Sequence, residues 1–338
     1  MRVLLTGGAG FIGSHVGEAL LRRGDRLAIV DNLDDFYSLE RKHSNLDEIR
    51  RHGEFDFFEA DICDFPRLQQ IFHKVCPEIV IHLAARAGVR PSIERPQLYE
   101  RVNVGGTYNL LELCREFKVG RCIFGSSSSV YGATDRVPFC EEDAKLQPIS
   151  PYAATKLAGE LAGYTYAHLH SMVVICLRFF TVYGPRQRPD LAIHKFTALM
   201  EAGQPIPVFG DGSMGRDYTY VDDIVHGIES SLAYQPLAGG APFEIFNLGN
   251  SHPIRLTELI EHLESATGRR AVLDSKPLQP GDVPLTWANL DKSSRLLGYS
   301  PQISFAEGIR RFVTWYRGTR AEMSRQAAGS GVAQPSAC

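Results

Sequence analysis

A glycine-rich segment near the N-terminus limits the fold more than any other feature of this 338-residue chain. Gly7, Gly10 and Gly13 follow an apolar run at residues 3–6 and precede an amphipathic stretch at residues 12–23. Glycine leaves the backbone amides and the positive end of the helix free to approach phosphate groups. The segment therefore predicts a strand, a tight turn and a helix that together bind a dinucleotide.

Short apolar runs alternate with amphipathic stretches through the first half of the chain. The expected strands are residues 3–6, 27–31, 55–59, 79–83, 121–126 and 172–178, and the expected helices are residues 12–23, 65–76, 99–117 and 152–169. Such alternation is typical of a parallel sheet with helices on both faces, joined by right-handed crossovers. We expect an α/β fold, with a doubly wound parallel Rossmann sheet and a smaller C-terminal α/β substrate lobe.

The amino-acid composition changes after residue 178, where glycine and proline become frequent. We expect residues 1–178 to form the dinucleotide-binding domain, with segments near 216–245 and 282–295 returning to it. Residues 179–320 would form mainly the substrate lobe. Residues 321–338 are rich in Ala, Gly, Ser and Gln, and we expect them to form a loose tail.

Composition excludes several classes of protein. With 36 basic and 39 acidic residues, the net charge is −3, which favours neither a nucleic-acid partner nor a membrane surface. No apolar run approaches the roughly 20 residues that cross a bilayer. The seven cysteines include no CxxC pair, so we expect reduced thiols, no metal site and a cytoplasmic protein.

Two acidic residues end expected strands and are candidates for contact with adenosine. Asp31 closes the second strand, where a carboxylate accepts both ribose hydroxyls and repels a 2′-phosphate, so NAD is favoured over NADP. Asp61 follows the third strand. It could meet the adenine amino group, or it could equally be an aspartate that forms a turn.

Tyr152 and Lys156 share one face of an expected helix that begins after Ser150 and Pro151. An ammonium beside a phenol stabilises phenolate, so this pair could supply a base near neutral pH. The spacing alone is weak evidence. Its value comes from the upstream glycine motif and from the hydroxyl-rich residues 126–129.

Several ordered segments together resemble the extended short-chain dehydrogenases that act on nucleotide sugars, and most closely the UDP-glucuronate 4-epimerases. These landmarks are the glycine motif and residues 82–85, 103–107, 126–132, 152–160, 178–185, 210–223 and 280–284. The resemblance covers nearly the whole chain. It implies NAD as cofactor, a UDP-sugar substrate and a UDP-sugar-binding lobe in residues 179–320.

The resemblance also implies roles for individual residues. Tyr152, Lys156, Ser127 and Ser128 would be catalytic, with Tyr152 acting on the 4-hydroxyl and Lys156 also holding the nicotinamide ribose. The cofactor would contact Gly7, Gly10, Phe11, Ile12, Gly13, Asp31, Asn32, Asp61, Ile62, Leu83, Ala84, Ala85, Asn103, Tyr152 and Lys156. The substrate would contact Arg86, Arg90, Ser127, Thr181, Arg188, Phe209, Arg216 and Asp282.

Some of these assignments have alternatives. Arg216 would clamp the UDP diphosphate, although a surface salt bridge would also explain an arginine there. Arg86 and Arg90 could equally be surface charges. The related UDP-galactose epimerases usually have an arginine where this chain has Gln279 and an asparagine where it has Thr181, which indicates a different hexose substituent.

The implied reaction passes through a 4-keto sugar, because hydride leaves C4 for NAD and later returns to the other face. With a uronic acid this intermediate is a β-keto acid that loses carbon dioxide readily, so the carboxylate needs restraint. Thr181 and Arg188 are the first candidates to hold it. We expect conversion of UDP-glucuronate to UDP-galacturonate.

Other reactions fit the sequence less well. Related dehydratases carry an acidic pair where this chain has Ser128 and Ser129, and related decarboxylases carry a glutamate just before the Val-Tyr-Gly segment. The alternatives are a neutral UDP-glucose/UDP-galactose 4-epimerase, a UDP-glucuronate decarboxylase and a catalytically idle dinucleotide sensor. Surplus apolar residues in helices 99–117 and 152–169 favour a homodimer, although a monomer stays open.

Overall fold

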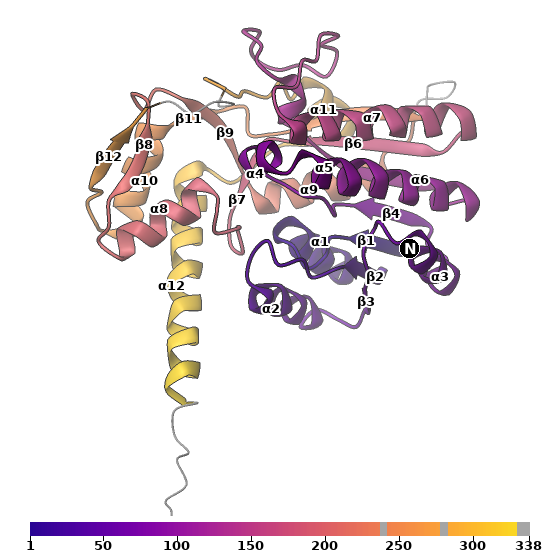
Figure 1. Ribbon diagram of the computed structural model, residues 1–338, viewed down its shortest axis with the longest axis horizontal. Helices are drawn as coiled ribbons and strands as arrows, with labels where there is room; N and C mark the ends of the chain where they lie inside the picture. The colour runs from indigo at the N-terminus through magenta and orange to yellow at the C-terminus, as the bar shows by residue number, and fades with distance from the viewer. Residues whose placement is uncertain (237–241, 278–282, 330–338) are drawn as a thin grey trace, which may run out of the picture.

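The computed structural model describes residues 1–236, 242–277 and 283–329. Its centre is a seven-stranded sheet with the order β10-β6-β5-β4-β1-β2-β3, in which every neighbouring pair is parallel (Figure 1). The strands are β1 Arg2–Thr6, β2 Arg26–Asp31, β3 Asp56–Glu59, β4 Ile79–His82, β5 Arg121–Ser127, β6 Val173–Phe179 and β10 Phe243–Leu248. The predicted doubly wound parallel sheet is confirmed.

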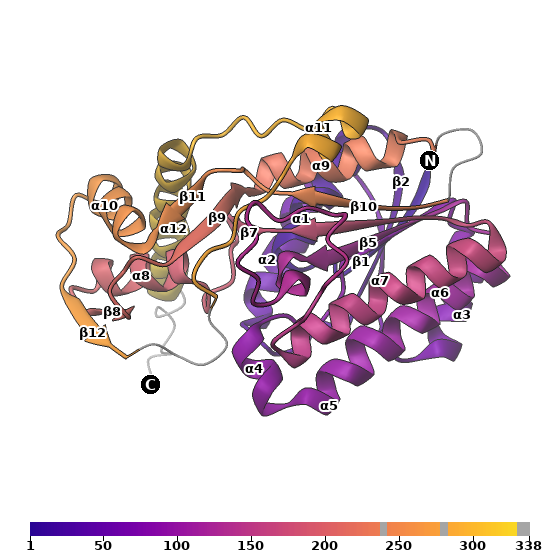
Figure 2. The same cartoon turned by 90° about the horizontal axis from the view of Figure 1, so that it is seen from above.

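Successive residues of these strands face two separate cores. In β1, Val3 and Leu5 join one core and Leu4 joins the other, because side chains alternate across a sheet. Helices α1 Phe11–Arg22, α2 Leu39–Arg50 and α9 Val221–Ala233 cover the first face. Helices α3 Phe65–Val75, α6 Gly106–Glu116 and α7 Pro151–His170 cover the second, as Figure 2 shows. Burial on both faces explains the nearly continuous apolar strands.

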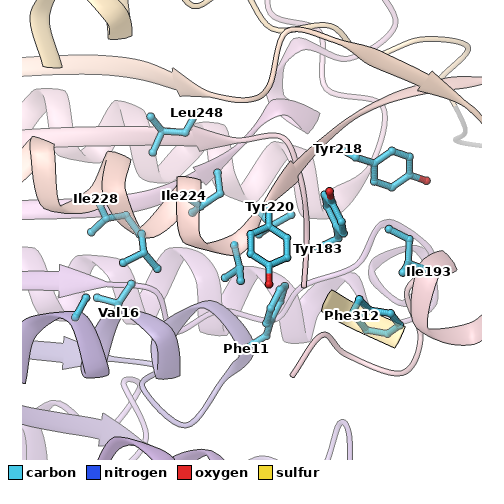
Figure 3. Close-up of a cluster of buried hydrophobic side chains, with 14 of the residues drawn as sticks. Phe11, Val16, Tyr183, Ile193, Tyr218, Tyr220, Ile224, Ile228, Leu248 and Phe312 are labelled. Atoms are coloured by element: carbon cyan, nitrogen blue, oxygen red, sulfur yellow. The ribbon is translucent and has the colours of Figure 1, made fainter. Parts of the chain in front are cut away.

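A smaller lobe lies beside the carboxyl ends of the large sheet. It contains α8 Ala192–Glu201, β8 Ile206–Phe209, α10 Leu256–Thr267, β12 Leu273–Lys276 and α12 Phe305–Gly329, with a second sheet of β7 Thr181–Tyr183, β9 Gly215–Tyr220 and β11 Pro253–Arg255. Tyr183, Tyr218 and Phe312 of this lobe belong to the same buried cluster as Phe11 and Val16 of α1 (Figure 3). The two parts therefore share a core.

Several expected elements differ in detail. The helix expected at residues 99–117 consists of α5 Pro96–Tyr99, a π-helical turn at Glu100–Gly105 and α6. Helix α4 Val89–Glu94, helix α2 and the short helix α11 Asp291–Leu297 were not predicted. Residues 321–329, which we expected in the loose tail, are helical and continue α12 to Gly329. Residues 330–338 lie outside the described part.

Within the described residues, no helix combines the length and the apolar character that a membrane crossing requires.

Leu113 of α6 tests the second core. Its side chain is fully buried among α3, α6 and strand residues. We expect Leu113→Ala to lower the free energy of unfolding by about 2–5 kcal/mol, because it removes buried methyl groups and leaves a cavity. Chemical denaturation followed by circular dichroism measures the change. A loss well under about 1 kcal/mol would show that this core is not packed as described.

Candidate active site

A cavity of about 480 Å³ opens at the carboxyl ends of β1, β2, β4 and β5 and extends to β7. Most of the predicted site residues line it. They are Gly7, Gly10, Phe11, Ile12, Gly13, Asp31, Asn32, Asp61, Ile62, Leu83, Ala84, Ala85, Ser127, Ser128, Tyr152, Lys156, Thr181 and Arg188. The edge formed by strand carboxyl ends is where doubly wound sheets bind nucleotides.

Two positions of this turn accept no residue other than glycine. Gly7 has φ +75°, and a Cβ there would lie 2.6 Å from the Ala84 nitrogen. A Cβ on Gly13 would overlap the carbonyl oxygen of Gly7. Gly10 precedes the first residue of α1 and borders the cavity. The turn thus presents the positive end of α1 to the cavity, which fits a pyrophosphate.

Asp31 lies buried at the end of β2, where it accepts hydrogen bonds from the amides of Ala9 (3.0 Å) and Leu33 (2.9 Å). Burial raises the pKa of Asp31. The positive charge of Lys42, whose Nζ lies 3.9 Å away, and the two amide hydrogen bonds partly offset this rise. Each carboxylate oxygen keeps a further lone pair for a ribose hydroxyl. The residues present therefore fit an adenosine ribose without a 2′-phosphate.

Asp61 behaves as a turn-forming aspartate. Its carboxylate accepts hydrogen bonds from the Cys63 amide (2.8 Å) and from the Asn32 side chain (3.2 Å). Both Asp61 and Asn32 also line the cavity. These contacts agree with the alternative in which Asp61 forms a turn. Contact between Asp61 and adenine stays a prediction.

Helix α7 brings the proposed reacting groups together. The Ser150 hydroxyl accepts a hydrogen bond from the Ala153 amide, and Pro151 occupies the first turn, which confirms the predicted helix start. Lys156 is buried and donates to the carbonyl oxygen of Gly125 at 2.7 Å. Tyr152 and Ser127, at the end of β5, both line the cavity, and the Ser127 hydroxyl donates to the Ser129 hydroxyl at 3.2 Å. A phenol, a hydroxyl and an ammonium therefore meet at one end of the cavity.

The charge that acts on Tyr152 differs from the expected one. Burial raises the pKa of Tyr152, opposed by the Ser127 side chain and by the positive charge of Arg188. Burial also lowers the pKa of Lys156 to about 8, opposed by the charge of Glu160. In the polypeptide alone, burial outweighs the positive charge of Arg188 at Tyr152. That Lys156 makes this phenol acidic stays a prediction.

Arg188 lines the cavity together with Thr181 of β7. Its Nε and Nη2 donate to the two carboxylate oxygens of Asp190, at 2.9 and 2.6 Å, and its guanidinium lies 5.2 Å from the ring centroid of Phe36. The side chain is 16% exposed. The guanidinium has five N–H donors, so others remain for a substrate carboxylate.

Five predicted site residues lie in the structure but do not line this cavity. Asn103 bonds to the backbone N–H and carbonyl of Arg86 and to Thr155, so it holds the loop after β4. Arg86 pairs with Asp34 at 2.6 Å. Arg90 lies 5.2 Å from the ring centroid of Phe209.

The Arg216 guanidinium donates to the Gly215 carbonyl oxygen. Asp282, the remaining predicted residue, lies outside the described part of the chain. For both residues, contact with the substrate stays a prediction.

Sequence reasoning missed the cavity residues that follow β2. Asp34, Phe36, Tyr37 and Lys42 all line the cavity, and they come from the loop before α2 and from α2 itself. The only sequence signal was a pair of aromatic residues close to Asp31. Within the described residues, no three His, Cys, Asp or Glu side chains gather as a metal site would require.

Gly13→Ala tests the cofactor turn. The added methyl group would push the Gly7 carbonyl out of place, so we expect dinucleotide affinity to fall by more than tenfold while the two apolar cores persist. Calorimetric titration with NAD measures the affinity. Gly318→Ala is the control, because a Cβ on this glycine of α12 would meet nothing within 4 Å. Unchanged NAD affinity in the Gly13 variant would contradict the assignment.

Comparison with known proteins agrees with this geometry. The family described as GDP-mannose 4,6 dehydratase matches residues 4–312. A UDP-glucuronate 4-epimerase from Thermodesulfobacterium geofontis is 45% identical, with 92% of this chain and 95% of that protein covered.

Solved structures are also similar. The UDP-glucuronic acid 4-epimerase from Bacillus cereus, in complex with UDP-glucuronic acid and NAD, has a TM-score of 0.87 at 34% identity, covering 94% of this chain and all of that one. A Thermotoga maritima UDP-glucose 4-epimerase with UDP-glucose has a TM-score of 0.86 at 33% identity, covering 95% and 100%. The chain therefore belongs to the GDP-mannose 4,6-dehydratase family, and within it to the NAD-dependent nucleotide-sugar epimerases.

Proposed function

We propose that this chain interconverts UDP-glucuronate and UDP-galacturonate by NAD-dependent epimerisation at C4. The observation that carries the proposal is a single cavity that joins a dinucleotide turn, the Tyr152–Ser127 pair and the cation of Arg188. The cation and Thr181 suit a sugar with a carboxylate at C6. The relatives that act on UDP-glucuronate support the same substrate.

The chain's own residues hold and orient the cofactor. The glycine turn receives the pyrophosphate and Asp31 receives the adenosine ribose. Lys156, fixed by Gly125, lies where it can hold the nicotinamide ribose. NAD, when bound, supplies a hydride acceptor at C4 and then a hydride donor.

Tyr152 holds the proton that the 4-hydroxyl gives up. Ser127 lines the cavity with Tyr152, and its hydroxyl can donate a hydrogen bond to the sugar oxygen as a carbonyl forms at C4. The same phenol returns the proton when the carbonyl is reduced from the other face. No net redox change results.

With a uronic acid as substrate, Arg188 and Thr181 would also prevent loss of the carboxylate. The 4-keto intermediate loses carbon dioxide when its carboxylate bond aligns with the carbonyl π system. A guanidinium that fixes the carboxylate can keep that bond out of alignment. Neither Ser128 nor Ser129 provides an acid for elimination, and Thr181 stands where a glutamate precedes the Val-Tyr-Gly segment in the decarboxylases.

A neutral UDP-hexose 4-epimerase is the main alternative, because the Thermotoga enzyme with UDP-glucose has nearly the same fold similarity. Arg188 is what favours the acid, since a neutral sugar needs no cation at C6. The two substrates give distinct products. Incubation of purified protein with UDP-glucuronate or with UDP-glucose, followed by proton NMR, distinguishes the proposal from this alternative and from decarboxylation to UDP-xylose.

The wider proposal includes a homodimeric, cytoplasmic protein. Large apolar side chains remain exposed on α6 and α7, namely Tyr108, Leu161, Tyr164 and Leu169. Two such helices from each copy can pack as a four-helix interface. We also retain the division into residues 1–178 and 179–320, with Arg216 on the UDP diphosphate and Asp282 among the substrate contacts.

Tyr152→Phe tests the proton carrier. The variant keeps the ring but has no hydroxyl, so we expect kcat to fall by about 10²–10⁴-fold with NAD content unchanged. Product formation by NMR and absorbance of released NAD measure the two effects. Tyr234→Phe, which alters a phenol packed on Phe246, is the control. Near-normal turnover of the Tyr152 variant would refute the assigned role.

Arg188→Ala tests carboxylate recognition. Loss of a charged hydrogen bond of about 1.5–3 kcal/mol should raise KM for UDP-glucuronate by roughly 10–100-fold, with UDP-xylose as a new product. The measurement is a kinetic series with product identification. Arg310→Ala, at an exposed ion pair with Glu307, is the matched control. An unaltered KM and product profile would move the carboxylate contact to another residue.

A further inference from the structure

Two side chains of the polypeptide itself hold the Arg188 guanidinium. Its Nε and Nη2 atoms donate to the two carboxylate oxygens of Asp190, at 2.9 and 2.6 Å, so one edge of the group is bound at two points. Its central carbon lies over the ring of Phe36, 5.2 Å from the centroid. A contact on the edge and a contact on the face together restrict the rotation and the tilt of a planar group.

The loop that carries Arg188 is attached to α1 by separate contacts. The ring Nε2 of His15 hydrogen-bonds to the carbonyl oxygen of Pro185 at 3.0 Å. Arg186 pairs with the Glu18 carboxylate at 2.6 Å. These contacts fix the backbone just before Arg188, but they do not fix the direction of its long side chain.

The bond to Asp190 leaves donors for a second carboxylate. A guanidinium has five N–H donors, and Asp190 takes one on Nε and one on Nη2. The remaining Nη2 donor and one Nη1 donor lie parallel along the next edge, where a second carboxylate can bind at two points. Arg188 and Phe36 both line the cavity. Arg188 can therefore be held by Asp190 and bind a uronate at the same time.

Stability of the fold does not account well for this arrangement. The Asp190 side chain is 41% exposed, and an ion pair with a solvent-exposed partner contributes little to folding. Phe36 is 37% exposed, so it buries less apolar surface than a core phenylalanine does. Control of the direction of Arg188 accounts for both side chains better.

The direction of Arg188 matters for the 4-keto intermediate of a uronic acid. Loss of carbon dioxide breaks the bond between C5 and the carboxylate carbon, and its electron pair forms an enolate with the C4 carbonyl. A proton then adds at C5, and the returned hydride gives UDP-xylose. A guanidinium that can swing still attracts the carboxylate, but it lets this bond rotate into alignment with the carbonyl π system.

We propose that Asp190 and Phe36 are positioning residues that fix the direction of the Arg188 guanidinium and thereby keep the substrate carboxylate out of alignment. Asp190 acts through Arg188. The inference rests on the proposed reaction and adds the residues that separate epimerisation from decarboxylation. It predicts a change in the products without weaker binding of the substrate.

The experiment compares the wild-type holoenzyme with Asp190→Asn, Phe36→Leu and Phe36→Tyr. Asp190→Asn removes the carboxylate with little change of shape, Phe36→Leu removes the aromatic face, and Phe36→Tyr keeps it. Proton NMR of reactions with UDP-glucuronate gives KM and the ratio of UDP-xylose to UDP-galacturonate. Asp47→Asn, at an exposed ion pair with Arg50, is the matched control.

We expect the UDP-xylose ratio to rise by about tenfold or more in Asp190→Asn and Phe36→Leu, because a small misplacement of a bound group changes rates by one to two orders of magnitude. KM should stay within about threefold of the wild type, because the charge of Arg188 remains. Arg188→Ala differs, since its KM should rise. Phe36→Tyr and the control should keep the wild-type ratio.

An unchanged product ratio in both Asp190→Asn and Phe36→Leu would overturn the proposal. A lower KM in Asp190→Asn without UDP-xylose would overturn it as well, because Asp190 would then compete with the substrate carboxylate instead of positioning its partner.

A second measurement needs no turnover. In protein with nitrogen-labelled arginine, the Nε–H signal of Arg188 is assigned with an Arg188→Ala sample. Its exchange with water should be faster in Asp190→Asn than in the wild type, because the bond to the carboxylate is lost. Equal exchange rates would overturn the proposal. A wild type that does not convert UDP-glucuronate would refute the proposed reaction, whereas the exchange rates would still test whether Asp190 holds Arg188.

Discussion

The close approach of α7 to β5 and β6 is the constraint on which the site depends. A Cβ on Gly159 would overlap the Phe124 ring, and one on Gly163 would lie 3.0 Å from Val174. Because these side chains are absent, the helix lies close enough for the Lys156 ammonium to reach the Gly125 carbonyl oxygen. The same approach puts Tyr152 beside Ser127 and Glu160 beside Arg178. Packing and chemistry therefore share one contact between helix and sheet.

This close packing has an electrostatic cost. Burial moves the pKa of Tyr152 up and that of Lys156 down, which disfavours the charged form of both groups. The reaction needs the opposite shifts: a lower pKa for the phenol, so that it can lose its proton, and a charged cation beside it. The positive charge of Arg188 acts to lower the pKa of Tyr152, and the negative charge of Glu160 acts to raise that of Lys156. The positive nicotinamide ring of bound NAD would act in the same direction as Arg188.

Much of this architecture could be predicted from the sequence because its signals are local. The glycine turn, the strand ends at Asp31 and Ser127, and the start of α7 each depend on neighbouring residues. Long-range pairing was not predictable: Asp34 engages Arg86, and Asn103 holds a loop instead of lining the cavity. The polar helix α2, which supplies Lys42, lacks strong apolar periodicity and was missed. The extension of α12 to Gly329 was also missed, because the composition of residues 321–338 is typical of unstructured tails.

The most direct measurement of the central claim follows the hydrogen at C4. UDP-glucuronate carrying deuterium at C4 is incubated with the protein in ordinary water, and the product is analysed by NMR and mass spectrometry. If the hydride is held on the cofactor and returned to the opposite face of the same sugar, UDP-galacturonate keeps its deuterium at C4. Product with hydrogen at C4 would contradict the account, because the C4 hydrogen would then exchange with solvent as a proton.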